Sequence, residues 1–390
     1  MTAHAGMAGA ESDPRRTLLL QLYHAALGAV DGRRRVRAAL AAAGGAGEVH
    51  ALAVGKAAAS MMQGALDALG PQVVRGLVVA PDDGSAQALA GHPAIRCLAG
   101  SHPLPDERSL AAGEALLGFA AATPPGSRVL LLVSGGASAL AESPAPGVTL
   151  AELRALTVQA FTEGWDIGRL NASRRRMSAI KGGRLVEAFR GCELQAFLMS
   201  DVPRDDPEVA ASGMLASAGC RVTVVARLAD ALEAAQRAAR AQGLDAALAP
   251  QRLDGPAIEA ARRICHEIAA VPQPLLIAGG ETVVRLPARP GRGGRCQHFA
   301  LAAARLIAGH PEYLLLAAGT DGRDGTSDDA GAIVDGNTLA RIEEAGLDAE
   351  AGLAAADSGT LLEAAGDLVY TGPTGTNVGD IVLALRQPLR

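Results

Sequence analysis

The sequence predicts an α/β protein with a mainly parallel sheet, because short apolar runs alternate with stretches of helical periodicity. The apolar runs are the predicted strands, at 50–54, 76–80, 128–133, 195–199, 222–226, 275–278 and 313–317. The helical stretches include 14–43, 107–122, 150–163, 228–242 and 255–270. Alternation of this kind places helices on both faces of a parallel sheet.

Length and punctuation predict two domains. A chain of 390 residues, 49% of them hydrophobic, can bury a core in each domain. A stretch rich in proline and polar residues at 244–255 marks the junction, which gives domains at 1–245 and 246–390. In the second part, segments 281–284 and 290–294 suggest a further, mixed sheet.

The composition favours a small-molecule ligand and argues against nucleic acid. The net charge is -5 and Trp, Tyr and Phe number 1, 3 and 5, so neither a basic face nor a set of stacking side chains stands out. The arginine-containing stretches at 33–37 and 174–176 fit solvated helix faces or phosphate patches.

Cysteine spacing and hydropathy predict a cytoplasmic protein. The 5 cysteines are odd in number and widely spaced, which argues against a disulfide framework or a zinc site. Residues 1–13 lack the basic start and apolar stretch of a signal peptide. No apolar run reaches the ~18 to 20 residues that cross a bilayer, so we expect no membrane partner.

A glycine-rich turn after the predicted strand 128–133 is the first candidate site. It reads Ser134-Gly-Gly-Ala-Ser138, and such a turn lets backbone N–H groups converge on an anion. Ser134 and Ser138 add hydroxyl donors of the kind that phosphates use. The alternative is a tight strand-to-helix turn that needs glycine for its dihedral angles and binds nothing.

Lys56 follows the predicted strand 50–54 in a similar turn, Val54-Gly-Lys-Ala57. A lysine at the start of a helix suits a phosphate as a point charge. The GxxxxGK[ST] spacing of a Walker A loop is absent. A lysine on the surface of a helix is the competing interpretation.

Asp201 and Asp321 each follow a predicted strand and are the candidate metal ligands. Mg²⁺ keeps several waters and needs only one or two protein carboxylates. The alternative is that both aspartates cap helices or turns. Further along, Glu281 and Arg295 lie in glycine-rich surroundings, where an arginine can neutralise a transferring phosphoryl group.

Nine segments taken in order resemble the glycerate 2-kinase family with its C-terminal MOFRL domain. They read VGKA, SHPLPDE, LLLVSGGASAL, LNASRRRMSAIKGGRL, SDVPRDDPEVAASG, AGGET, GRGGRCQ, AAGTDGRDGTSDDAGA and TGPTGTNVGD. The resemblance covers about residues 15–385. It implies a Rossmann-like three-layer N-terminal domain, a smaller MOFRL-type α/β domain and an active site in the cleft between them.

The family's activity implies that ATP and a divalent metal, Mg²⁺, are used to phosphorylate D-glycerate at its 2-hydroxyl. Carried over by residue, the resemblance makes Lys56 and Arg295 the catalytic candidates, as cations that gather phosphoryl charge. It implies that the nucleotide and substrate are bound by Ser134, Gly135, Gly136, Ser138, Asn171, Lys181, Glu281, Thr374 and Asn377. Assigning the metal to Asp201 and Asp321 is an inference from chemistry. We expect a monomer or homodimer.

Several departures from the family pattern bear on activity. The SGGGSA loop has Ala137 in place of a glycine, and the GGRNQE motif has Cys296 and His298 in place of an amide and a carboxylate. The ASGPT turn reads ASGML at 211–215, and the segment from there to Arg221 is shorter. A divergent homologue that binds without turnover therefore stays an alternative, as does hydroxypyruvate reductase, against which the missing GxGxxG fingerprint argues.

Overall fold

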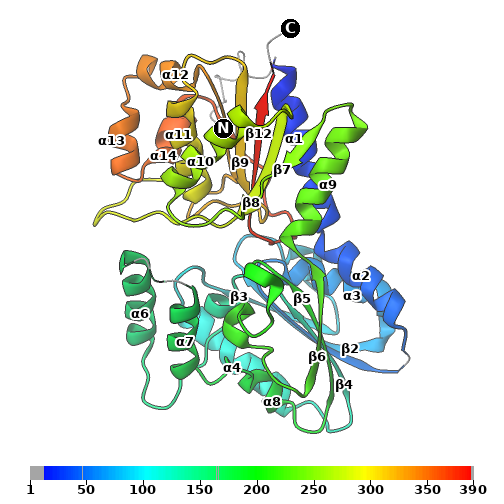
Figure 1. The fold of residues 1–390 in the computed structure, drawn as a ribbon. Helices are drawn as coiled ribbons and strands as arrows, with labels where there is room; N and C mark the ends of the chain where they lie inside the picture. Colours follow the sequence, from blue (N-terminus) through cyan, green and yellow to red (C-terminus); the bar gives the residue numbers. More distant parts are fainter. Residues whose placement is uncertain (1–12, 46, 164, 166, 388–390) are drawn as a thin grey trace. The chain divides into compact units, whose positions relative to one another are not determined.

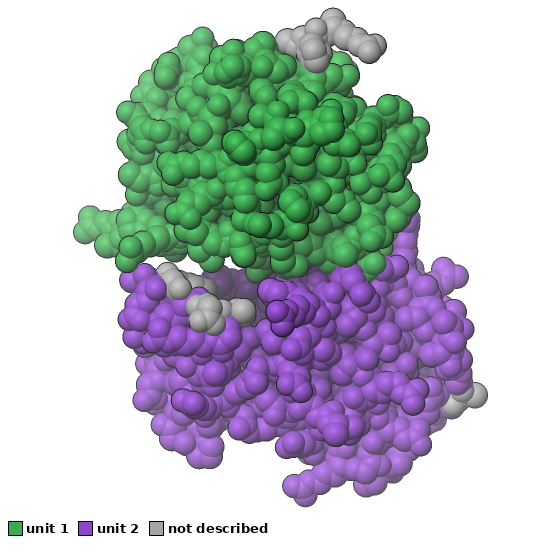
Figure 2. All heavy atoms as spheres, in the orientation of Figure 1, with its two compact units in different colours: residues 1–29, 228–374, 379–390 green, residues 30–227, 375–378 purple. Residues whose placement is uncertain are grey.

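The structure is a computed structural model that describes residues 13–387 except 46, 164 and 166. The expectation about residues 1–13 falls outside this part, apart from Asp13. The chain forms two compact units, coloured separately in Figure 2. Unit 1 comprises residues 1–29, 228–374 and 379–390, and unit 2 comprises residues 30–227 and 375–378.

Unit 2 contains a six-stranded sheet, and all of its strands run parallel. Its order is β3-β2-β1-β4-β5-β6. The strands are β1 (Val49–Val54), β2 (Val73–Pro81), β3 (Ile95–Gly100), β4 (Arg128–Val133), β5 (Glu193–Met199) and β6 (Cys220–Ala226). This is the order of doubly wound nucleotide-binding folds, which bind ligands where the order reverses, here between β1 and β4.

Helices cover both faces of this sheet and make three layers (Figure 1). One face packs on α2 (Gly32–Ala43) and α3 (Ala58–Leu69). The other buries a core of branched side chains against α4 (Glu107–Ala121), α5 (Ala137–Leu140) and α8 (Arg184–Ala188). The unit also has α6 (Leu150–Glu163), α7 (Ile167–Arg176) and short 3₁₀ turns η1 (Gly70–Gln72), η2 (Gln87–Leu89), η3 (Pro203–Asp205) and η4 (Ala210–Gly213).

Unit 1 contains a mixed six-stranded sheet in the order β11-β10-β9-β12-β8-β7. The strands are β7 (Ala246–Leu248), β8 (Leu275–Gly280), β9 (Tyr313–Gly319), β10 (Gly331–Asp335), β11 (Leu368–Val369) and β12 (Asp380–Arg386). Only the β7–β8 pair is parallel among these described strands. The last strand in sequence, β12, is antiparallel to both of its neighbours, β8 and β9.

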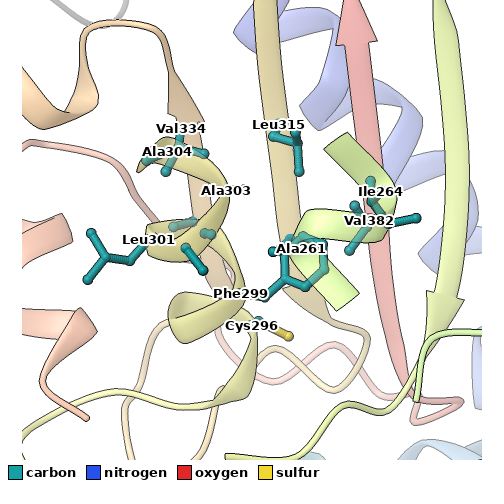
Figure 3. Close-up of a cluster of buried hydrophobic side chains, with 14 of the residues drawn as sticks. Ala261, Ile264, Cys296, Phe299, Leu301, Ala303, Ala304, Leu315, Val334 and Val382 are labelled. Carbon is teal, nitrogen blue, oxygen red and sulfur yellow. The ribbon is translucent and has the colours of Figure 1, made fainter. Parts of the chain in front are cut away.

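The sheet of unit 1 is also covered on both faces (Figure 1). One face carries α1 (Pro14–Ala29) and α9 (Leu228–Ala241), and the other carries α10 (Ala257–Ala270) and α11 (Arg295–Leu306). Figure 3 shows Phe299 of α11 and Ala261 of α10 in the core of the second face. The remaining helices are α12 (Thr338–Glu344), α13 (Ala349–Ala354) and α14 (Ser358–Ala364).

The predicted α/β class and the parallel N-terminal sheet are confirmed. The segment 281–284 is not a strand, and only Val283 makes an isolated bridge, to Pro256. The two compact units are interleaved along the chain, because unit 1 takes residues 1–29 and 379–390 as well as 228–374. The domain boundary at 245–246 stays a prediction. The N-terminal helix α1 groups with α9 and with β9, to which the Tyr23 hydroxyl donates at the Gly319 carbonyl (2.6 Å). No described helix is long and apolar enough to span a membrane.

Candidate functional site

The turns after β1 and β4 in unit 2 are joined at the point where the strand order reverses. The Lys56 N–H donates to the Gly135 carbonyl (2.9 Å), and the Ser134 N–H donates to the Val54 carbonyl (3.1 Å). Because β1 and β4 are adjacent and parallel, both glycine-rich turns emerge at the same edge. The structure thus brings Lys56 to the glycine turn that the sequence singled out.

Close backbone approach explains the glycines of these turns. Gly55 has a φ of +131°, and a Cβ there would overlap Ser134. Gly136 has a φ of +82°, and the side chains of Lys56 and His102 lie against its open face, 3.0 and 3.3 Å from an added Cβ. Ser134 itself is buried and accepts from the Ala57 N–H (3.0 Å), so its hydroxyl fixes the first turn of the lysine segment.

Asp201 and Asn377 lie beside the same turn, at the end of β5. The Asn377 amide nitrogen donates to an Asp201 carboxylate oxygen (3.3 Å). A Cβ on Gly135 would overlap both of these side chains. The Asn377 N–H also points at the Met199 sulfur (3.0 Å), which holds segment 375–378 on unit 2.

A chain of hydrogen bonds connects Ser138 to the loop that follows β5. The Ser138 and Ser212 hydroxyls are 2.7 Å apart, and Ser212 donates to the Asn171 side-chain oxygen (2.8 Å). The Asn171 nitrogen donates to the Val209 carbonyl (3.0 Å). Ser212 and its neighbour Ala211 have φ of +56° and +49°, which non-glycine residues seldom adopt.

Lys181 is enclosed within unit 2 rather than presented at the turn. Its side chain is 0% exposed and forms an ion pair with Glu142, which also accepts from the Ser178 hydroxyl (2.5 Å). Burial lowers the pKa of Lys181, although Glu142 opposes that shift. The assignment of Lys181 to ligand binding stays a prediction that would require this ion pair to open.

Arg295 and Glu281 come together in unit 1. The Arg295 Nε donates to Asp380 (2.6 Å), and Nη2 donates to Glu281 (2.7 Å). The Asp380 side chain is 9% exposed and the Arg295 side chain 36%. The guanidinium is therefore bound on its buried side by Asp380, while part of it reaches the surface. Burial opposes the charged form, but Asp380 and Glu281 raise the pKa of Arg295 well above its usual value.

Asp324 is a functional candidate that sequence reasoning missed. Its carboxylate accepts from the backbone N–H groups of Cys296 (3.0 Å) and Gln297 (2.7 Å), so it caps α11 immediately after Arg295. Burial raises its pKa to about 7. The signal was available as the second Asp-Gly pair of Asp321-Gly-Arg-Asp-Gly325.

Asp321 and Thr374 lie together after β9. The Asp321 carboxylate accepts from the Arg323 N–H (3.1 Å), which is the turn-capping contact expected of an aspartate in a loop. The Thr374 hydroxyl donates to the Thr320 carbonyl (2.5 Å). Both residues are therefore at the same sheet edge as Arg295, because β8 and β9 end where β12 begins.

Cys296 and His298, the two departures next to Arg295, are buried. Figure 3 shows Cys296 beneath Phe299 in the core of unit 1. The His298 Nδ1 lies 3.2 Å from the Ser358 hydroxyl, and burial lowers the pKa of the imidazole. Both side chains therefore lie on the buried side of the first turn of α11.

No group of three or more His, Cys, Asp or Glu side chains in the described chain could hold a metal ion unaided. A surface pocket of about 430 Å³ lies at the opposite, amino-terminal ends of β1 and β4. It is lined by Glu48, His50, Pro125, Gly126, Ser127 and Arg128. The candidate site residues are not among them.

Comparisons with known proteins identify both halves of the chain. Residues 18–243 match DUF4147, a domain of unknown function, and residues 274–380 match the MOFRL family. The D-glycerate 2-kinase of Thermotoga maritima is 33% identical over 86% of this chain and 89% of that protein. An Agrobacterium vitis protein provisionally named hydroxypyruvate reductase is 37% identical over 86% of each chain.

A solved structure agrees with this relationship. The crystal structure of a glycerate kinase from Thermotoga maritima superposes with a TM-score of 0.78 at 31% identity. It covers 96% of this chain and 99% of that one. The chain therefore belongs to the glycerate 2-kinase family and carries a DUF4147 domain followed by a MOFRL domain.

Proposed function

We propose that this chain transfers the γ-phosphoryl group of ATP to the 2-hydroxyl of D-glycerate. The observation that carries the proposal is the hydrogen-bonded pair of turns at which Lys56 meets the glycines after β4. Ligands of doubly wound sheets bind at this position. The names of the relatives, D-glycerate 2-kinase and glycerate kinase, are the basis for choosing D-glycerate as the acceptor substrate.

The glycine turn suits the phosphates of the nucleotide. Gly135 and Gly136 have no side chains to keep an anion from the backbone, and the first turn of a helix has N–H groups without intrahelical partners. Ala137, where the family has glycine, is buried, so its methyl group is packed inside unit 2. Ser134 contributes by fixing the turn that carries Lys56.

Lys56 and Arg295 are the proposed catalytic cations. Phosphoryl transfer has little covalent chemistry for the protein to perform, so positioning and charge stabilisation dominate. Asp380 and Glu281 engage Nε and Nη2 of Arg295, which fixes the plane of the guanidinium. A fixed cation stabilises charge that develops in the transition state without having to reorganise.

The residues after β5 fit a magnesium ion bound to phosphate. Asp201 offers a hard carboxylate oxygen, Asn377 borders it, and both side chains lie so close to Gly135 that a Cβ there would overlap them. Mg²⁺ commonly uses one or two carboxylates together with substrate phosphates, so a cluster of protein ligands is not required. When bound, the ion would neutralise phosphate charge. Asp321 is the second candidate ligand.

Hydroxypyruvate reduction is the second candidate function. The strand order of unit 2 and the name of the Agrobacterium relative favour it. The turn after β1 opposes it, because Val54-Gly-Lys-Ala57 lacks the GxGxxG that brings a pyrophosphate close to the helix. A homologue that binds nucleotide or acid without turnover is the third.

One assay separates these functions. The protein is mixed with D-glycerate, ATP and Mg²⁺, and ADP release is followed beside NADH oxidation with hydroxypyruvate. We expect ADP release alone, reduced about 100-fold or more by Lys56→Ala and by Arg295→Ala, as for other transition-state donors. Arg292→Ala is the matched control, since this arginine bonds Glu363 and the Gly359 carbonyl instead.

Two results would contradict the kinase. NADH oxidation without ADP release would assign the reductase. Binding of ATP without turnover in either reaction would assign the non-catalytic homologue. Circular dichroism of each variant confirms that a lost activity is not a lost fold.

A further inference from the structure

The hydrogen bonds from Ser138 to Asn171 have a fixed direction. The Val209 carbonyl can only accept, so the atom of Asn171 that faces it is the amide nitrogen. The Asn171 oxygen must then face Ser212, at 2.8 Å. A carboxamide oxygen also only accepts, so the single hydroxyl proton of Ser212 points at Asn171.

This direction determines the role of Ser138. The hydroxyl proton of Ser212 is already donated to Asn171. Ser138 must therefore be the donor in the hydrogen bond of 2.7 Å between the Ser138 and Ser212 hydroxyls. The Ser138 oxygen then has no proton left for another partner. It can serve a ligand only as a hydrogen-bond acceptor.

The surroundings prevent this arrangement from reversing. Ser212 and Asn171 are 1% and 3% exposed, so water does not compete for their bonds. The left-handed backbone at Ala211 and Ser212 is a costly conformation that persists only where the surroundings fix it. Ser138, in contrast, is partly exposed and forms the accessible end of the chain.

We propose that Ser138 accepts a hydrogen bond from a hydroxyl group of the acid substrate, and does not bind phosphate. This inference rests on the proposed kinase function. Phosphate and carboxylate oxygens are acceptors at neutral pH, so they would face the lone pairs of Ser138. The hydroxyls of a hydroxy acid are the donors that the acid brings to the turn, and the reacting one must approach the transferred phosphoryl group.

The test measures binding rather than turnover. Calorimetry gives the affinities of wild type and Ser138→Ala for D-glycerate and for a non-hydrolysable ATP analogue. We expect Ser138→Ala to weaken D-glycerate binding by about 3- to 10-fold, the loss of one neutral hydrogen bond. The affinity for the ATP analogue should not change, which also shows that the variant is folded.

Two analogues identify which hydroxyl is recognised. D-Lactate lacks the 3-hydroxyl, and 3-hydroxypropanoate lacks the 2-hydroxyl. The analogue without the recognised hydroxyl should bind wild type and Ser138→Ala equally, while the other should lose affinity as D-glycerate does. If the substitution affects both analogues equally, Ser138 recognises no hydroxyl and the inference is overturned.

Two further variants serve as comparison. Ser217→Ala removes a serine hydroxyl from the same loop, where it accepts from the Gly219 N–H (3.4 Å), and should change neither affinity. Ser212→Ala should weaken D-glycerate less than Ser138→Ala, because the Ser138 oxygen can still accept. A greater loss in Ser212→Ala, at unchanged nucleotide affinity, would contradict the assigned direction.

The remaining outcomes separate this inference from the proposed function. Weaker binding of the ATP analogue by Ser138→Ala, with D-glycerate unaffected, would overturn the inference and leave the kinase in place. D-Glycerate binding without ADP release would overturn the kinase, while the affinities still decide the role of Ser138. Wild type that binds no D-glycerate would overturn both.

Discussion

Asp324 is a buried carboxylate that caps the helix carrying Arg295 and that titrates near neutral pH. Its carboxylate accepts from two backbone N–H groups in the first turn of α11, directly after Arg295. The helix N-terminus favours the ionised form, but burial outweighs it and raises the pKa to about 7. Asp324 therefore changes charge near neutral pH, unlike an exposed aspartate.

Asp324→Asn should alter how stability depends on pH. Between about pH 4 and 7 the folded protein holds a proton on Asp324 that the unfolded chain has released, because the folded pKa of about 7 exceeds the ordinary 3.8. The stabilisation is complete below pH 4 and is lost as pH rises through 7, by up to about 4 kcal/mol. Urea unfolding at pH 5 and pH 8 should show a smaller decline for Asp324→Asn than for wild type.

Asp328→Asn provides the matched control, since Asp328 is 77% exposed and pairs with Arg323. It should retain the decline of the wild type. An equal decline in Asp324→Asn and wild type would show that Asp324 is ionised throughout this pH range.

The positions of site residues at strand ends could be predicted from the sequence, whereas the side chains that hold them in place could not. Lys56 and Asp201 follow apolar runs directly, and parallel strands bring such positions to one edge. Asp324 lies 28 residues from the helix that it caps, and Asp380 lies 85 residues from Arg295. Such partners depend on the strand order of the sheet in unit 1, and no local sequence pattern determines that order.

Helix α4 shows two different uses of glycine within one element. Asp106 caps its first turn in a capping box with Ser109. Gly113 is buried, and an added Cβ would overlap the carbonyl of Glu142, the partner of Lys181. Gly118 is exposed, and a Cβ there would meet no atom within 4 Å.

Alanine at these two positions should change stability in opposite directions. Gly113→Ala forces α4 away from the segment that carries Glu142, which should cost about 1–3 kcal/mol of unfolding free energy. Gly118→Ala should add about 0.4–1 kcal/mol, because alanine restricts the unfolded chain and favours the helix. Urea unfolding of the two variants measures both. Equal destabilisation would mean that close packing at Gly113 does not limit this helix.

The periodicity of the sequence predicted seven of the described strands but missed β3, β7, β10, β11 and β12. Strand direction does not explain the difference, because the predicted strands β8 and β9 pair antiparallel with β12 and the missed strand β3 pairs parallel with β2. The seven predicted strands all lie within β1, β2, β4, β5, β6, β8 and β9. β12 is as apolar as these, but it follows a glycine-rich turn and ends the described chain with no helix after it. The alternation of strands and helices therefore gave no signal for it.

At the scale of the whole molecule, the order of the chain differs from the order of its packing. Unit 1 takes α1 from the beginning and β12 from the end, and β12 lies in the middle of its sheet. Unit 2 is nearly continuous and is completed by residues 375–378. The sheet of unit 1 thus cannot be completed until β12 has been made.

Truncation after Gly379 should therefore unfold unit 1 and spare most of unit 2. It removes β12, whose residues 381–385 are at most 2% exposed and whose backbone pairs with both β8 and β9. Those two strands would lose their shared partner, and their apolar faces would be exposed to water. Hydrogen exchange should show β8 and β9 unprotected while β1 and β4 stay protected. A chain ending at Gln387 retains β12 and should match wild type, whereas protection of β9 in the shorter chain would contradict the central role of β12.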